Sequence, residues 1–131
     1  MSNKKYSVLH LEDNQDIADL LTMILENENI VYKHVQTFKQ AYEHLDKGLP
    51  HLMLVDLMLE DDIHAEPGIK FIKDAYQKFP GLKMMVLSNR GDSSIRKDLN
   101  DYIVDFEEKI FKPSTFKTKL IQKLNDIYLT E

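Results

Sequence analysis

The chain has 131 residues, of which 43% are hydrophobic and 30% are charged, so it fits one folded domain rather than two domains or a disordered segment. Its 22 Asp and Glu residues outnumber its 17 Lys and Arg residues, and the net charge of −5 argues against a nucleic-acid-binding surface. The chain has no cysteine, which excludes disulfides and thiolate chemistry, and no apolar run of signal-peptide or membrane-spanning length, so we expect a cytoplasmic protein that binds no membrane.

Short apolar runs that suit strands alternate with longer segments whose apolar residues recur at helical spacing. The first run predicts a strand over Tyr6–Leu11, and the segment after it predicts a helix over Gln15–Glu28. A second strand over Ile30–Val35 precedes a helix that opens with a capping box at Thr37 and closes at Gly48.

The most strand-like run of the chain is Leu52–Val55, whose continuous apolar character is typical of a parallel strand buried on both faces. This strand is expected to end at Asp56. A charged, irregular stretch over Glu60–Pro67 then leads to a third helix with an apolar stripe over Ile69–Phe79. The elements predicted after it are a strand over Leu82–Leu87, a helix capped by Asp92 or Ser93 with its apolar stripe over Ile95–Ile103, a short strand over Lys109–Phe111 and a helix that begins at Lys112–Ser114.

Five strands that alternate with five helices predict a single (βα)5 domain, because right-handed crossovers place parallel strands in one sheet and helices on both of its faces. We therefore expect an α/β fold with a doubly wound, parallel five-stranded sheet. In such sheets, ligands bind beyond the carboxyl ends of the strands, near the point where the strand order reverses. The function of the chain is thus expected to depend on the residues that follow each strand.

Polar residues follow four of the predicted strands: Glu12 and Asp13 the first, Asp56 the third, Ser88 the fourth and Lys112 the fifth. Carboxylates that converge without His or Cys at the strand ends suit Mg²⁺, with Asp13 and Asp56 as direct ligands and Glu12 acting through water. A Ser88 hydroxyl and a Lys112 ammonium would hold phosphoryl oxygens, which leaves the Asp56 carboxylate as the nucleophile. The pattern predicts metal-assisted phosphoryl transfer onto Asp56. Taken singly, each residue also fits a turn, a helix cap or a solvated surface, and only their combination favours a site.

Four segments of the chain carry a family resemblance. They are Val8–Asn14, Leu52–Leu59, Met85–Ser88 and Phe111–Pro113. Together they resemble the receiver domain of two-component response regulators, over essentially the whole chain. The resemblance implies a flavodoxin-like fold with strand order 2-1-3-4-5, one receiver domain over residues 1–131, and a cis peptide between Lys112 and Pro113.

The resemblance also implies roles for individual residues and partners. The site residues are the phosphoacceptor Asp56, the Mg²⁺ ligands Asp13 and Asp56, Glu12 holding a metal-bound water, the backbone carbonyl of Met58, and Ser88 and Lys112 as partners of the phosphoryl group. A histidine kinase or a histidine phosphotransfer protein would donate the phosphoryl group. The surface of the fourth helix, fifth strand and fifth helix would then bind an effector or a second copy of the chain.

Three features depart from the family pattern. Gly68 lies twelve residues after Asp56, farther than the family places its glycine, and an acidic stretch with Glu60 in place of a proline fills the interval. Asn89 stands where the family prefers a smaller residue, and Lys109 replaces an aromatic residue that takes part in switching. These departures concern the switching surface and access to the site more than the acceptor carboxylate.

Other functions fit parts of the pattern. A receiver-like module that binds partners without phosphorylation would keep the same fold, and Asn89 and Lys109 favour it. An aspartate-based phosphatase would need a second Asp where the chain has Met58, and a nucleotide switch would need a Gly-x-x-x-x-Gly-Lys-Ser/Thr loop that the sequence lacks. Both a stand-alone receiver and a segment of a longer regulator fit the sequence.

Overall fold

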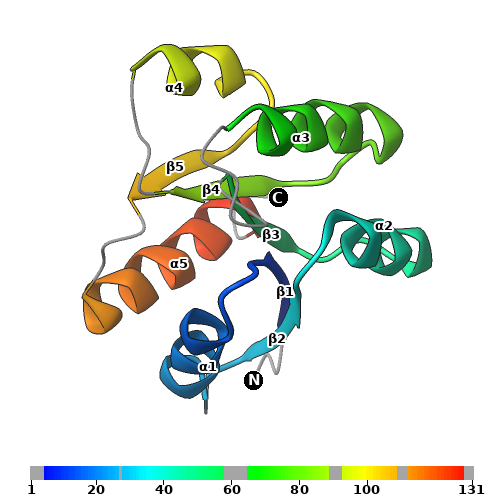
Figure 1. The fold of residues 1–131 in the computed structure, drawn as a ribbon. Helices are drawn as coiled ribbons and strands as arrows, with labels where there is room; N and C mark the ends of the chain where they lie inside the picture. Colours follow the sequence, from blue (N-terminus) through cyan, green and yellow to red (C-terminus); the bar gives the residue numbers. More distant parts are fainter. Residues whose placement is uncertain (1–4, 27, 58–64, 89–92, 109–111, 129–131) are drawn as a thin grey trace.

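The computed structural model describes residues 5–26, 28–57, 65–88, 93–108 and 112–128. Within these ranges, five strands alternate with five helices along the chain (Figure 1). The strands are β1 (Tyr6–Leu11), β2 (Ile30–Val35), β3 (Leu52–Asp56), β4 (Met84–Ser88) and β5 (Asp105–Glu108). The helices are α1 (Gln15–Ile24), α2 (Phe38–Lys47), α3 (Glu66–Lys78), α4 (Ser93–Leu99) and α5 (Pro113–Tyr128). This alternation confirms the predicted (βα)5 organisation.

The strands form one sheet in which every neighbouring pair is parallel. Their order is β2-β1-β3-β4-β5, which confirms both the predicted parallel sheet and the order that the resemblance implied. Because β1 lies between β2 and β3, the chain reverses its direction of winding after β2. Sheets of this class bind ligands at such a reversal, here the carboxyl ends of β1 and β3.

Helices cover both faces of the sheet (Figure 1). α2, α3 and α4 enclose one core, which includes Val55 and Ile72, and α1 and α5 enclose the other, which includes Leu54 and Phe116. Successive residues of a strand point to opposite faces, so β3 supplies both cores and all of its residues are buried. The double burial predicted from its continuous apolar run is confirmed. In the described part of the chain, no helix is long and apolar enough to cross a membrane.

Side-chain caps fix the starts of α1 and α2. The Asn14 side-chain oxygen accepts hydrogen bonds from two backbone N–H groups in the first turn of α1. The Thr37 hydroxyl accepts from the Gln40 N–H at 3.1 Å, as the capping-box pattern predicts, whereas Gln40 Oε1 accepts from the Gln36 N–H and not from Thr37 itself. The chain therefore turns into a helix at a defined residue after both β1 and β2.

Two helices end earlier than the sequence predicts. α1 stops at Ile24 rather than Glu28. α4 stops at Leu99, so Tyr102 and Ile103 follow the helix and pack against the core from outside it. In both cases the chain leaves the helix in time to form backbone hydrogen bonds with the sheet immediately before the next strand, β2 or β5.

Two later elements also begin earlier than predicted. Glu66 and Pro67, predicted as irregular, form the first turn of α3, where a proline is favourable because that position needs no N–H donor. β5 precedes the predicted strand over Lys109–Phe111, which lies outside the described residues. The cis peptide expected between Lys112 and Pro113 stays a prediction, because the side chain of Pro113 lies outside what the structure describes.

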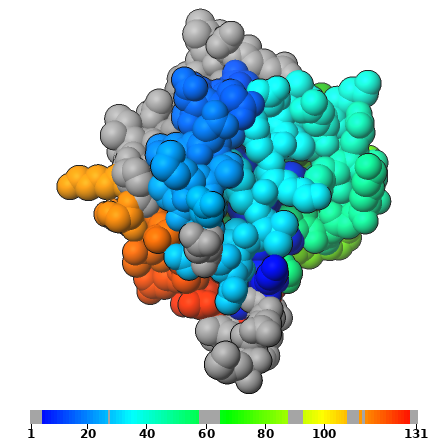
Figure 2. Space-filling view, turned by 90° about the horizontal axis from the view of Figure 1, so that it is seen from below, coloured from blue at the N-terminus to red at the C-terminus, as the bar shows by residue number. Residues whose placement is uncertain are grey.

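β2 forms one edge of the sheet and lies between α1 and α2 when the molecule is viewed from that edge (Figure 2). Its strand neighbour is β1, with Ile30 opposite Tyr6 and Val35 opposite Leu11. Val31 is 42% exposed, whereas Tyr32 is partly buried. Ile30, Tyr32 and His34 are partly buried and alternate with exposed residues, so their side chains share one face of β2.

Candidate functional site

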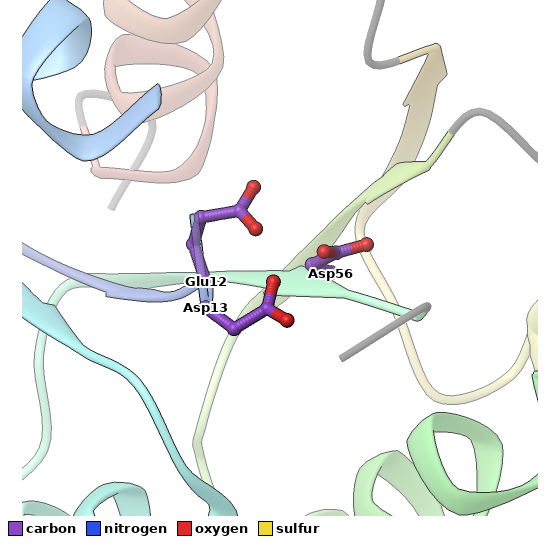
Figure 3. Close-up of side chains that lie close together, drawn as sticks. All are labelled: Glu12, Asp13 and Asp56. Carbon is purple, nitrogen blue, oxygen red and sulfur yellow. The ribbon is translucent and has the colours of Figure 1, made fainter. Parts of the chain in front are cut away.

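Three carboxylates meet at the carboxyl edge of the sheet (Figure 3). Glu12 and Asp13 follow β1, and Asp56 ends β3, the neighbouring strand. One carboxylate oxygen of each residue lies within 4.8 Å of the others. The structure therefore brings together the three acidic residues that the sequence singles out.

The three acids differ in their exposure. Glu12 and Asp56 are 0% and 1% exposed, whereas Asp13 is partly exposed, so solvent reaches the cluster at Asp13. Like charges that are buried together repel one another unless a cation lies between them. A donor set made of carboxylate oxygens, with access to water, has the chemistry of a Mg²⁺ site, because this ion retains several waters and takes one or two carboxylates. The residues present therefore fit the predicted ion.

The main chain and the side chain of Glu12 are both hydrogen-bonded. Its N–H donates to the Val35 carbonyl of β2 at 3.0 Å, and its carbonyl accepts from His34 Nε2. Its Oε2 accepts from the N–H of Asn14, the N-cap of α1, at 3.3 Å. β2 and the start of α1 therefore hold Glu12 from two directions.

A polar cluster on β1 and β2 adjoins Glu12, and sequence reasoning missed it. His10 is 0% exposed, and its Nδ1 lies 2.6 Å from the Tyr32 hydroxyl. His34 lies opposite His10 in strand register, with the ring centroids 6.2 Å apart. Burial, followed by the negative charges of Glu12 and Asp19, raises the pKa of Tyr32, so its hydroxyl stays protonated. The signal that could have located the cluster is a histidine within each of two otherwise strand-like runs.

Asp56 is positioned by β4 and by the start of α3. It pairs in register with Leu87 of β4. The next residue, Leu57, is 1% exposed, and Gly68 of α3 lies against its backbone. A Cβ at Gly68 would stand 2.8 Å from the Leu57 carbonyl oxygen, so this close approach requires glycine.

Of the remaining predicted site residues, the structure describes Lys112 and the backbone of Ser88. Ser88 ends β4, one residue beyond the strand partner of Asp56, so its backbone reaches the same edge of the sheet. Lys112 is exposed, and its carbonyl accepts from the Phe116 N–H at 2.9 Å. Among the described residues, no hydrogen bond or ion pair joins Lys112 to the three carboxylates. Met58 lies outside the described residues.

Comparison with known families identifies the domain. The model of the response regulator receiver domain matches residues 8–125. The chain belongs to the response regulator receiver domain family. The receiver is thus a signalling domain of two-component systems, and its three converging acids stand at the carboxyl edge of the sheet, where the strand pattern of the sequence predicts them.

Two curated bacterial regulators are related to the receiver in sequence. The regulatory protein VanR from Enterococcus faecium is 39% identical over 59 residues, which are 45% of the receiver and 24% of VanR. The transcriptional regulatory protein CssR from Bacillus subtilis (strain 168) is 29% identical over 131 residues, which cover 94% of the receiver and 53% of CssR. The receiver therefore spans about a quarter of one relative and about half of the other.

Solved structures of other receivers share the fold. A response regulator from Thermotoga maritima superimposes with a TM-score of 0.82 at 17% identity, covering 93% of the receiver and 99% of that chain. A CheY-like receiver domain protein from Methanospirillum hungatei JF-1 gives a TM-score of 0.80 at 21% identity, covering 94% of the receiver and 96% of that chain. These matches confirm the flavodoxin-like architecture.

Proposed function

We propose that the receiver accepts a phosphoryl group on Asp56 in a Mg²⁺-dependent reaction and that the modification changes a partner-binding surface. The observation that carries the proposal is the meeting of Glu12, Asp13 and Asp56 within 4.8 Å at the carboxyl edge of the sheet, in a chain of the receiver family. A capping or turn role would account for each acid singly. It would not account for three acids from two strands at one point.

The Asp56 carboxylate is the nucleophile of the proposed reaction. One of its oxygens forms a bond to phosphorus as the phosphorus–nitrogen bond of a phosphohistidine breaks, and the leaving imidazole takes up a proton. The Ser88 hydroxyl would donate a hydrogen bond to one phosphoryl oxygen, and the Lys112 ammonium would pair with another. The receiver therefore catalyses only its own phosphorylation and the later loss of the phosphoryl group.

Asp13 and Asp56 are the proposed direct ligands of Mg²⁺, with Glu12 acting through a bound water and the Met58 carbonyl as a further ligand. When bound, the ion supplies positive charge that offsets the repulsion among the carboxylates and the phosphoryl oxygens. Asn14, which caps α1 and donates its N–H to Glu12, keeps the acidic pair at the start of that helix.

A histidine kinase or a histidine phosphotransfer protein is the proposed phosphodonor, which places the receiver in a cytoplasmic two-component system or phosphorelay.

The proposed responding surface comprises α4, β5 and α5 and would bind a downstream effector or a second copy of the chain. Within this surface, ion pairs join α5 to β5, Lys119 to Glu107 at 3.2 Å and Lys123 to Asp105 at 3.4 Å. We assign residues 1–131 to one receiver domain, without a nucleic-acid or membrane surface of its own.

The alternative is a receiver-like module that binds its partners without phosphorylation. Asn89 and Lys109, which favour this alternative in the sequence, lie outside the described residues. The buried acids favour phosphorylation, because burying charge is costly and a module that acts only through its surface gains nothing from it.

Mass spectrometry of the intact chain tests the proposal. After incubation with Mg²⁺ and a small acyl phosphate, we expect the mass to increase by one phosphoryl group, and we expect no increase when Mg²⁺ is chelated. Asp56→Asn removes the nucleophile and should stay unmodified. Asp19→Asn, a matched change at an exposed acid on α1, should be phosphorylated as the parent is.

Two results would contradict the proposal. A parent chain that gains no phosphoryl group under these conditions would favour the non-phosphorylated module. A phosphoryl group that appears equally on Asp56→Asn would place the modification at another residue.

A further inference from the structure

Strand β2 is bonded to both polar groups of the Glu12 main chain. The Val35 carbonyl accepts from the Glu12 N–H at 3.0 Å, which continues the pairing of β1 with β2 beyond the end of β1. The Glu12 carbonyl accepts from His34 Nε2, so the second bond comes from a side chain. Because a carbonyl oxygen only accepts, Nε2 carries the hydrogen in this contact.

The Glu12 carbonyl belongs to the peptide group that joins Glu12 to Asp13. That group is planar, so a hydrogen bond to its oxygen fixes the orientation of the plane between the two acidic residues. Glu12 and Asp13 stand at the two ends of this group, and one carboxylate oxygen of each lies within 4.8 Å of one of Asp56. Rotation of the plane would move Glu12 and Asp13 relative to Asp56 and relative to each other.

Neighbouring side chains restrict the His34 ring. His34 faces His10 across the β1–β2 pair, with ring centroids 6.2 Å apart and ring planes inclined by 55°. His10 is 0% exposed, and its Nδ1 lies 2.6 Å from the hydroxyl of Tyr32. Tyr32 and His34 alternate with exposed residues of β2 and therefore share one face of the strand. A buried, hydrogen-bonded partner thus limits the rotation of the ring that reaches Glu12.

We propose that His34 is a positioning residue of the metal site: its Nε2–H fixes the peptide between Glu12 and Asp13 and so sets the spacing of their carboxylates for Mg²⁺. The inference rests on the proposed function, since it takes the carboxylates to bind Mg²⁺. Groups that orient metal ligands by hydrogen bonds contribute a factor of about 10 to 100 in metal affinity. We expect a value near the lower limit, about tenfold, because this bond goes to the backbone and not to a ligand atom.

Isothermal titration calorimetry with Mg²⁺ on the full chain tests the role of His34. His34→Phe keeps a ring but removes the donor, and we expect the Mg²⁺ affinity to fall by about tenfold. His34→Gln restores a side-chain N–H donor, and we expect it to recover most of the lost affinity. If His34 only stabilised the fold, its replacement would lower the unfolding midpoint. The Mg²⁺ affinity would then not be lost in His34→Phe and recovered in His34→Gln.

His51→Phe is the matched control. It makes the same substitution at the amino end of β3, where His51 Nδ1 accepts from the Ser7 N–H at 2.9 Å. Both substitutions thus remove a contact between a histidine ring and the backbone of β1 or its extension. We expect His51→Phe to lower stability while Mg²⁺ binds with the affinity of the parent.

The outcomes separate this inference from the proposed function. A parent chain that does not bind Mg²⁺ overturns the metal site itself. A parent that binds Mg²⁺ while His34→Phe binds it equally well overturns only the positioning role. The positioning role is also overturned if His34→Gln binds as weakly as His34→Phe, because the restored donor would then have no effect.

The tautomer of His34 can be measured on the parent chain, so this test does not depend on whether a variant folds. The contact requires the His34 tautomer with its hydrogen on Nε2, and imidazole ¹⁵N chemical shifts distinguish the two tautomers. We expect the Nε2–H tautomer with and without Mg²⁺. We also expect Mg²⁺ to shift the His34 resonances but not those of His51. A neutral His34 with its hydrogen on Nδ1 would overturn the inference.

Discussion

Gly68 shows how a missing side chain lets a helix approach the end of β3 closely, next to the proposed acceptor Asp56. Its position lets the first turns of α3 rest on the backbone of Leu57, the residue after Asp56. A Cβ there would lie 2.8 Å from the Leu57 carbonyl oxygen and 2.9 Å from its Cα. The interval between Asp56 and Gly68 is longer than in the family pattern, yet it ends in a direct contact with the end of β3.

Gly68→Ala is expected to destabilise the receiver. Overpacking against fixed backbone costs about 1 to 3 kcal/mol, whereas replacing glycine by alanine within a helix alone would stabilise it by up to about 1 kcal/mol. The sign of the change in unfolding free energy, measured by urea denaturation, therefore tells which effect dominates. We also expect weaker Mg²⁺ binding, because Leu57 adjoins Asp56.

Lys70→Ala is the control for this substitution. It lies on the same helix and is exposed, so we expect a change within about 0.5 kcal/mol. A Gly68→Ala variant that is more stable than the parent would show that the contact with Leu57 relaxes without cost.

The convergence of the three acidic residues was predictable from the sequence, and the contact of His34 with Glu12 was not. Glu12, Asp13 and Asp56 each follow an apolar strand, and parallel strands end at one edge, so their convergence follows from the strand pattern alone. His34 lies at the end of a different strand, and periodicity does not tell which strand neighbours β1. The strand order that the resemblance implied places β2 beside β1, but it does not show that the His34 ring reaches the Glu12 carbonyl.

At the scale of elements, β5 is a strand that its own residues do not predict. Three of its four residues are acidic, and acidic residues are depleted in strands. The sequence therefore predicts the strand over Lys109–Phe111, which follows β5. The remaining residue, Phe106, is 7% exposed and packs into the core. α5 supplies the compensating charge, because Lys119 pairs with Glu107 and Lys123 with Asp105. The stability of β5 thus depends on contacts far away in the sequence.

β1, β2 and α2 match their predicted bounds because their signals are local. The two strands are bounded by polar residues on both sides, and α2 carries its own start and stop residues at Thr37 and Gly48. Where an element is defined by its caps and its apolar pattern, the sequence suffices. Where it depends on pairing with another strand and on a distant helix for compensating charge, as β5 does, the sequence does not.

α2 also carries a group whose protonation affects folding. Burial lowers the pKa of His44 below its ordinary value of 6.5, and the positive charges of Lys33 and Lys47 lower it further. The unfolded chain therefore binds a proton at His44 more readily than the folded chain does. By linkage, the free energy of unfolding should fall as the pH drops below 6.5 and should be unaffected by His44 above it.

His44→Gln is expected to reduce this pH dependence. Urea midpoints measured for the parent and the variant at about pH 7.5 and about pH 5.5 give the comparison, and the parent should lose more stability between the two values. The other four histidines are common to both proteins and cancel in the difference. Parallel losses in parent and variant would show that the environment of His44 does not depress its protonation.

At the scale of the whole molecule, the carboxylate cluster connects the two cores. Glu12 and Asp13 lead into α1, which packs with α5 on one face of the sheet. Asp56 leads through Leu57 to α3, which packs with α2 and α4 on the other face. A change of charge or bonding at this edge therefore acts on both helical layers. This arrangement supports the proposal that phosphorylation at Asp56 alters a surface that includes α4 and α5.

The edge position of β2 has a consequence for local opening. β2 has β1 as its strand neighbour, whereas β1, β3 and β4 each have two. Elements at the periphery open at a lower free energy than those in the interior, so the backbone amides of β2 should exchange hydrogen with solvent faster than those of β3. Glu12, however, is bonded to this strand through Val35 and His34.

Hydrogen exchange followed by mass spectrometry should therefore register Mg²⁺ along β2. Opening of β2 would break the two bonds to Glu12, so an ion held by the acidic cluster should slow exchange in peptides that cover residues 30–35. β5, the opposite edge strand, is the internal control and should exchange at the same rate with and without the ion. Equal protection of both edges would indicate a general stabilisation of the fold. The expected result is selective: an ion held at one end of the sheet slows the opening of a strand that contributes none of its ligands.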